Sequence, residues 1–227
     1  MANDNLQENL NYSFLLHPDA KDLFAELDYA LKNGQHIQKQ TKPDGIFNFI
    51  RHEFNSFKEY YKEYFELYLS TEGLDDEQYY FIDFRRDPNG NFSRGKIPLG
   101  NREYLKDSYI IIGFLLIRIY ILELNPEIKH SITGFKNRIL HDYEEYKTSL
   151  LRLFAKSNDI NNTDYEEDSI DNPIENALKK FNELGWILLD KNSDIFEILP
   201  SCKRLLKIYE ENIRDIDNII KQNTTKG

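Results

Sequence analysis

The sequence predicts a mainly α protein with small β-hairpins, an α+β fold. Apolar residues recur every three or four positions over most of the chain, which is the spacing of amphipathic helices. Short runs of aromatic and β-branched residues flank turn-rich segments, which is typical of hairpins. The chain has 227 residues, of which 40% are hydrophobic and 14% aromatic. This length and composition permit one large core or two small ones.

Two helices are predicted at the start of the chain. Residues 19–33 follow Pro18, carry apolar residues at helical spacing and end at Asn33-Gly34, a common C-terminal signal. Residues 46–68 predict one long amphipathic helix with an aromatic stripe. We interpret the stripe as core packing, and ligand stacking as the less favoured alternative.

A hairpin and a buried helix are predicted next. The runs 78–84 (QYYFIDF) and 92–97 flank residues 86–91, which are rich in Pro, Asn and Gly. Residues 101–123 follow and are apolar on almost every side between Ile110 and Ile117. We therefore expect a helix buried between layers at the centre of the protein.

The second half repeats this order. Residues 131–140 and 143–154 keep the helical period, and the acidic segment 158–171 is interpreted as a loop. Pro173 is expected to open a helix that runs to Leu184 and is ended by Gly185.

A second hairpin and a last helix close the sequence. Residues 186–189 and 195–199 predict the two strands, and residues 201–220 predict the helix. Two copies of helices, hairpin and closing helix indicate tandem winged-helix domains, which we place at residues 1–125 and 126–227. Winged helices bind proteins as well as DNA, so this order alone does not define the function.

Charge and composition limit the classes of function. The formal net charge of -10 opposes tight autonomous binding to nucleic acid, so any DNA contact should be local or shared with partners. The single cysteine, Cys202, excludes an internal disulfide and a cysteine-based zinc site, and fits a reducing compartment. Residues 1–11 lack the features of a secretory signal, and the apolar run 109–122 is shorter than the ~20 residues of a membrane span. We expect a cytoplasmic protein without a membrane segment.

No motif in the sequence predicts a catalytic site, cofactor or metal. Residues 90–97 match a phosphate-binding loop as far as Lys96, but Ile97 replaces the Ser or Thr that holds magnesium. An enzyme using this loop is the last-ranked hypothesis. Asp87, Asn89 and Asn91 resemble the start of a calcium loop that lacks its terminal Glu, and the five histidines show no metal-ligand spacing.

Basic residues near the two hairpins are the candidate DNA contacts, through backbone phosphates. An ordinary solvated surface is the alternative, and we favour it for the second hairpin. The candidates are Arg85, Arg86, Arg94 and Lys96 in the first half and Lys179, Lys180 and Lys191 in the second.

A winged-helix transcription regulator is the alternative function. Its recognition helix would span residues 173–184, whose polar positions carry no arginine to read guanine.

Several segments together resemble one known family: QYYFIDF, SRGKI at 93–97, REYLKDSYIIIGFLLIRIYILE at 102–123, and FNELGWILLD with FEILP at 181–200. Over residues 15–212 the chain is similar to the MukE and MksE subunits of bacterial condensins, including those of plasmid-defence condensins. The resemblance implies a non-catalytic, nucleoid-associated homodimer that binds a kleisin (MukF- or MksF-like). The kleisin bridges an SMC-type coiled-coil ATPase (MukB- or MksB-like), and DNA is bound by the assembled complex. The implied role is chromosome segregation and DNA condensation, or plasmid defence.

Overall fold

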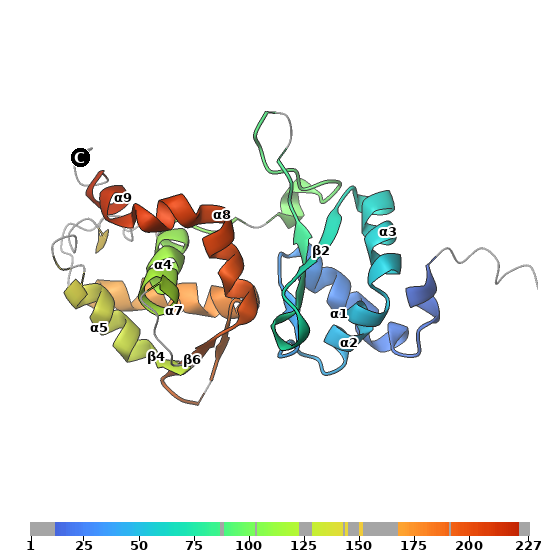
Figure 1. The fold of residues 1–227 in the computed structure, drawn as a ribbon, viewed down its shortest axis with the longest axis horizontal. Coiled ribbons are helices and arrows are strands. Elements are labelled where there is room, and N and C mark those ends of the chain that lie inside the picture. The colour runs from blue at the N-terminus through green and yellow to red at the C-terminus, as the bar shows by residue number, and fades with distance from the viewer. Residues whose placement is uncertain are drawn as a thin grey trace, which may run out of the picture. The chain divides into compact units, whose positions relative to one another are not determined.

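The protein is described by a computed structural model that covers residues 12–86, 89–102, 104–122, 129–142, 144, 150–151, 168–190 and 192–222. The chain divides into two compact units, residues 1–103 and residues 104–227 (Figure 1). Each unit has its own hydrophobic core and one three-stranded antiparallel sheet. The predicted class, mainly α with small β-hairpins, is confirmed.

Unit 1 begins with helices that pack on its sheet. The predicted first helix is confirmed, with Leu23, Leu27 and Leu31 on its buried face. It ends before Gly34, whose φ of 84° is the left-handed conformation that glycine adopts without strain. The helices are η1 (Ser13–Leu16), α1 (Ala20–Lys32), α2 (Ile46–His52) and α3 (Phe54–Phe65).

The prediction of one long helix over residues 46–68 was wrong. The chain leaves helical geometry at Glu53, which separates α2 from α3. Helix α3 ends at Glu66, whose φ of 55° is left-handed, and the Leu67 N–H donates to Tyr61 O across this end. Such a C-terminal cap needs no glycine when the hydrogen bonds are satisfied. The aromatic stripe continued past this end, so residues 67–68 could not be separated from the helix by periodicity.

The first predicted hairpin has a different partner strand. Strand β3 (Tyr79–Asp83) pairs with β2 (Tyr68–Glu72), which precedes it, and with the short β1 (Ile37–Gln38). The sheet order is β1-β3-β2, and a short helix, η2 (Asp75–Glu77), lies in the β2–β3 connection. Residues 92–97 form no strand and make only an isolated bridge between Arg86 and Phe92. The Lys96 N–H donates to Phe65 O at the end of α3 instead of to a β-ladder.

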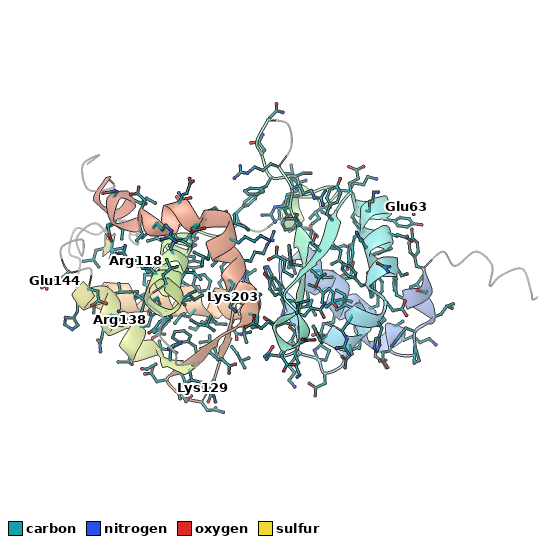
Figure 2. All side chains as sticks on the ribbon, in the orientation of Figure 1. Glu63, Arg118, Lys129, Arg138, Glu144 and Lys203 are labelled. Carbon is teal, nitrogen blue, oxygen red and sulfur yellow. The ribbon has the colours of Figure 1, made fainter. Side chains whose placement is uncertain are left out.

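The core of unit 1 is rich in aromatic rings. Phe57 is fully buried and stacks on Phe14 at a centroid distance of 4.2 Å. The Phe49 ring meets the Phe57 ring edge-on, at a centroid distance of 5.1 Å. At the rim, Glu63 lies on α3 (Figure 2). The Tyr12 hydroxyl donates to its carboxylate, and this bond raises the pKa of Tyr12. The predicted core role of the aromatic stripe is therefore confirmed for Phe49, Phe57 and Tyr61.

Unit 2 is built around the buried helix α4, which packs against α7 and α8 (Figure 1). Almost every side chain from Ile111 to Ile117 is buried in the core of this unit. The chain thus divides between residues 103 and 104, whereas we expected this helix to close the first domain, with the division after residue 125. The elements are η3 (Leu99–Asn101) in unit 1, and in unit 2 α4 (Asp107–Ile117), the π-helical segment η4 (Arg118–Leu122), α5 (Ile132–Asp142), α7 (Asp168–Glu183), η6 (Pro200–Cys202), α8 (Lys203–Arg214) and α9 (Ile216–Gln222).

The second predicted hairpin is confirmed. Strands β5 (Ile187–Leu189) and β6 (Ile195–Ile198) pair antiparallel, with Leu189 opposite Phe196. A third strand that the sequence did not predict, β4 (Lys129–Ser131), pairs with β6 on its other side, so the order is β4-β6-β5.

Other expectations for the second half are met in part. Helix α7 begins at Asp168, so Pro173 lies inside it and forfeits one helical hydrogen bond instead of opening the helix. Most of residues 143–154 and of the predicted acidic loop 158–171 lies outside the described residues. The last helix is divided into α8, which is kinked at Tyr209, and α9.

The main described elements up to each hairpin follow one order in both units, and α8 and α9 follow the hairpin in unit 2. Unit 1 runs α1, β1, α2, α3, β2, β3, and unit 2 runs α4, β4, α5, α7, β5, β6. In each sheet the last strand of the hairpin lies in the middle, between the short first strand and the other hairpin strand. In this order α4 has in unit 2 the place that α1 has in unit 1.

Candidate functional site

The basic residues predicted in the first half lie on two adjacent segments after β3, residues 84–86 and 92–96, which we call the basic loop. The Ser93 N–H donates to Arg85 O over 2.8 Å, and Arg86 bridges to Phe92. Arg85, Arg86 and Lys96 are exposed, and Arg94 is half-buried. Strand-like pairing of two short segments thus brings together four cations that the sequence separates by up to eleven positions.

Each arginine of the basic loop is stacked on an aromatic ring. The guanidinium carbons lie 3.9 Å from the Tyr68 ring for Arg85, 4.2 Å from the Phe92 ring for Arg86, and 4.2 Å from the Phe84 ring for Arg94. Stacking restrains a guanidinium plane while leaving its N–H edge able to donate. Arg86 also donates to Gly90 O over 2.6 Å. These arginines are held in place before any ligand binds.

Backbone contacts fasten the basic loop to α3. The Lys96 N–H donates to Phe65 O over 2.8 Å, and the Lys96 Nζ lies 3.2 Å from Glu66 Oε1. Gly95 has a φ of 50°, and a Cβ at this position would lie 2.1 Å from Phe65 O. Only glycine allows the loop this close to the helix end.

The geometry does not support a phosphate-binding loop at residues 90–97. A P-loop joins a strand to a helix and uses the helix N-terminus, whereas this loop lies against the C-terminus of α3 and its lysine pairs with Glu66. Asp87 of the calcium-like motif lies outside the described residues. Within the described part of the chain, no group of three or more His, Cys, Asp or Glu could hold a metal ion. Burial raises the pKa of the Cys202 thiol to about 12, which disfavours the reactive thiolate.

A pocket that the sequence did not predict lies beside the basic loop. It has a volume of about 280 Å³ and lies between α3 and β2. Its lining combines cations with apolar and hydroxyl side chains: Phe54, Lys58, Lys62, Leu67, Tyr68, Leu69, Ser70, Thr71 and Arg85. Lys58 and Lys62 are four residues apart, so they lie on one helix face. This spacing was visible in the sequence, but its meaning depended on β2, a strand that the sequence analysis did not predict.

The basic candidates of unit 2 lie on α7 or outside the described residues. Lys179 is exposed, and Lys180 forms an ion pair of 3.0 Å with Glu183 on the same helix. Lys191 is not among the described residues. Unit 2 therefore shows no counterpart of the stacked arginines within its described residues.

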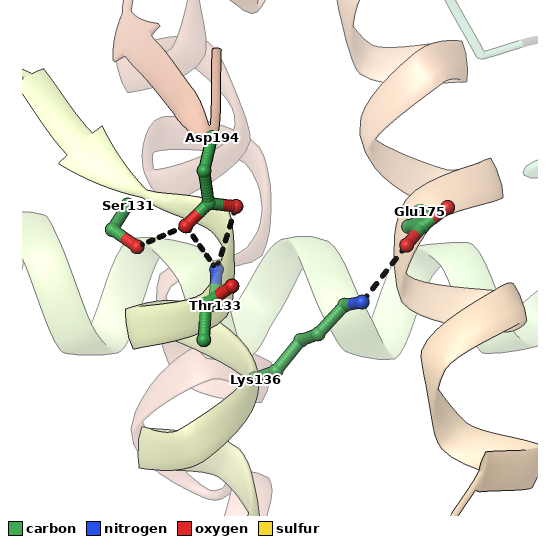
Figure 3. Close-up of polar contacts among 5 residues, drawn as sticks. All are labelled: Ser131, Thr133, Lys136, Glu175 and Asp194. Atoms are coloured by element: carbon green, nitrogen blue, oxygen red, sulfur yellow. Dashed lines mark hydrogen bonds and ion pairs between the residues drawn. The ribbon is translucent and has the colours of Figure 1, made fainter.

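The hairpin connection of unit 2 carries carboxylates with structural partners. Asp194 accepts from the Ser131 hydroxyl over 2.6 Å and from the Thr133 N–H over 3.1 Å, at the start of α5 (Figure 3). The Ser131 hydrogen bond holds the pKa of Asp194 below its ordinary value. Lys136 and Glu175, 2.8 Å apart, join α5 to α7 (Figure 3). The connection of unit 1 is also acidic, with Asp75, Asp76 and Glu77 exposed.

None of the described helices is long and apolar enough to cross a membrane. A comparison with curated proteins found no significant match. The family model of the condensin complex protein MksE matches residues 22–210, which include most of both units. The chain therefore belongs to the MksE family and is a subunit of a condensin complex.

Proposed function

We propose that this chain is a non-catalytic, kleisin-binding adaptor of its condensin complex, acting as a homodimer at the nucleoid. The family match over residues 22–210 carries the proposal. The kleisin bridges an SMC-type coiled-coil ATPase, and ATP hydrolysis belongs to that partner. The complex acts in chromosome organisation and segregation or in plasmid defence.

The repeated order of elements supports two winged helices. In both units a helix, a short strand, a helix, a further helix and a hairpin follow one another, and the last strand is central. This is the order of a winged helix-turn-helix unit, in which α3 and α7 occupy the position of the recognition helix. The domains we propose are the two units, with α4 beginning the second.

The basic loop is the proposed auxiliary DNA contact. Its arginines are exposed or half-buried and oriented by aromatic rings, which suits contacts with phosphates. Lys179, Lys180 and Lys191 are weaker candidates. A net charge of -10 makes tight binding by the isolated chain unfavourable, so the contact serves DNA already held by the complex.

The alternative, a winged-helix transcription regulator, is less well supported. Helix α7 presents no arginine, and the two hairpin connections, which would approach the DNA backbone, carry acidic residues. Sequence-specific binding of promoter DNA by the purified chain alone would favour this alternative.

Purification of the tagged chain from its native cells tests the adaptor function. Mass spectrometry should identify a kleisin and a large coiled-coil ATPase, and light scattering of the purified chain should give the mass of a dimer. A fourth, nuclease-like protein would indicate plasmid defence. Recovery of a monomer without these partners would contradict the proposal.

A charge-reversal variant tests the DNA contact. In the reconstituted complex, Arg86→Glu with Lys96→Glu should weaken DNA binding and reduce the slope of log K against log salt by about one per lost phosphate contact. The matched control is Lys21→Glu with Lys42→Glu, two exposed positions outside the basic loop. Equal salt slopes for both variants would reject the basic loop as a DNA contact.

A further inference from the structure

The pocket between α3 and β2, which we call the α3–β2 groove, has one cationic wall. Lys58 and Lys62 are exposed on the face of α3 that borders the groove, and neither forms an ion pair with a described residue. Arg85 lines the same groove, with its guanidinium over the Tyr68 ring. Arg85 Nε also lies 3.7 Å from Asp83 Oδ2, so the two lysines are the lining cations without an ion pair to a described residue. These charges border a space of about 280 Å³, whose ligand should carry negative charge.

The opposite wall is the edge of a sheet. Strand β2 is an outer strand in the order β1-β3-β2, and it pairs with β3 alone. Residues Tyr68 to Thr71 therefore offer main-chain donors and acceptors on the side away from β3. An extended peptide can add to such an edge as a further strand. Phe54, which is half-buried, and the exposed Tyr68 supply apolar surface for side chains of the added strand, whereas Leu67 and Leu69 are almost fully buried.

We propose that the α3–β2 groove binds an extended acidic segment of a partner protein. The segment adds to the edge of β2, and its carboxylates face Lys58, Lys62 and Arg85. The inference rests on the proposed function in one respect, that the partner is another subunit of the complex.

The distribution of charge favours a peptide over duplex DNA in this groove. Arg85 lies over Tyr68, where β2 begins, whereas the other end of the hairpin carries the exposed Asp75, Asp76 and Glu77. A duplex along α3 would bring phosphates to these carboxylates, which costs binding energy. A single extended chain needs only the strand spacing of about 4.8 Å and can end before the acidic connection.

A synthetic peptide in which Glu alternates with Val is the probe, because this period places all carboxylates on one side of a strand. Fluorescence anisotropy with the full chain should show binding that weakens with salt. Lys58→Glu with Lys62→Glu should weaken it by about tenfold or more. Lys58→Arg with Lys62→Arg should retain it, and so should the control pair Lys21→Glu with Lys42→Glu. Equal losses in the groove and control variants would overturn the proposal.

Hydrogen exchange distinguishes strand addition from a loose charge contact. The peptide should slow amide exchange within residues 68–72 and leave β5 unchanged. If the peptide does not bind, or binds without protecting β2, the proposal fails. Binding of a short DNA duplex that the same lysine pair abolishes, without peptide binding, would assign the groove to DNA instead.

The test of the groove and the test of the proposed adaptor function have independent outcomes. If the chain assembles with kleisin and ATPase but ignores the acidic peptide, only the groove assignment is wrong. If the peptide protects β2 but no condensin partner co-purifies, the groove assignment is supported and the adaptor function is contradicted.

Discussion

The two units follow the same order of elements with different cores. Unit 1 surrounds its sheet with aromatic rings, such as the stacked pair Phe14 and Phe57. Unit 2 surrounds one apolar helix, α4, in which Ile112 and Leu115 are fully buried. One topology is thus compatible with two ways of filling space, provided that each core reaches the density of protein interiors.

The surfaces of the two units differ more than their folds. In unit 1, Lys58 and Lys62 are not neutralised by described carboxylates, and the arginines of the basic loop stack on rings. In unit 2, Lys136 and Lys180 are paired with Glu175 and Glu183. Unit 1 also contains ion pairs, such as Lys39 with Asp76 and Lys96 with Glu66, so the difference is confined to the lysines of the pocket and the stacked arginines. Both recognition sites that we propose, the basic loop and the α3–β2 groove, therefore lie in unit 1.

The largest effects should come from the two cores. Phe57→Ala and Phe196→Ala each remove a fully buried ring, which typically costs about 3–5 kcal/mol of stability. Urea unfolding should measure the loss, and hydrogen exchange should locate it. Because the cores are separate clusters, Phe57→Ala should expose amides of unit 1 first, and Phe196→Ala those of unit 2. Identical exchange patterns in both variants would show that the units unfold as one.

An intermediate loss of stability is expected from a substitution where the basic loop lies against α3. Gly95→Ala would place a Cβ 2.1 Å from Phe65 O at a φ of 50°, so the loop must move or strain. We expect a loss of about 1–3 kcal/mol in urea unfolding, or displacement of the loop with weaker DNA binding by the complex. Gly100→Ala is the matched control, because a Cβ there meets nothing within 4 Å. Full stability and DNA binding in Gly95→Ala would show that the anchoring is unnecessary.

Features with local signals were predictable from the sequence. Helix α1 ends at Asn33-Gly34, and the second hairpin follows Gly185 at once, so turn chemistry defined both. The first hairpin was predicted between residues 78–84 and 92–97 because these two runs flank a turn-rich segment. In the structure β3 pairs instead with β2, the strand that precedes it. Strand pairing is a tertiary choice between competing partners, and periodicity within each run does not decide it.

Only part of the candidate site was predictable, again because the pairing of segments is not visible in the sequence. Arg85, Arg86, Arg94 and Lys96 were named because they are close in sequence, and the structure brings them together through a different backbone path. Their stacking on Tyr68 and Phe84 could not be inferred without the register of the sheet. Lys58 and Lys62 were missed because a groove requires two walls, and the second wall, β2, was not predicted; its first residue, Tyr68, had been assigned to the helix.

The smallest effect concerns the carboxylate at the start of α5. The Asp194 carboxylate caps the start of α5 by accepting hydrogen bonds from the Ser131 hydroxyl and the Thr133 N–H. Asp194→Ala removes this cap, which should lower the free energy of unfolding by about 1 kcal/mol. The folded-state pKa of Asp194 is lowered, first by the Ser131 hydrogen bond, so the ionised form is favoured in the fold. Its contribution is therefore present above the unfolded pKa of about 3.9 and is lost as the pH falls through the lower folded value.

Urea titrations of the wild type and Asp194→Ala between about pH 6 and pH 2 test this sign. The two unfolding free energies should differ at pH 6 and converge in acid. Asp75→Ala is unsuitable as a control because Asp75 has a φ of 51°, which alanine tolerates poorly, but Asp75→Asn changes a carboxylate in the corresponding connection of unit 1 at little backbone cost. A difference that stays constant down to pH 2 would mean that Asp194 acts through packing. A larger effect in Asp75→Asn would remove the contrast between structural carboxylates in unit 2 and solvated ones in unit 1.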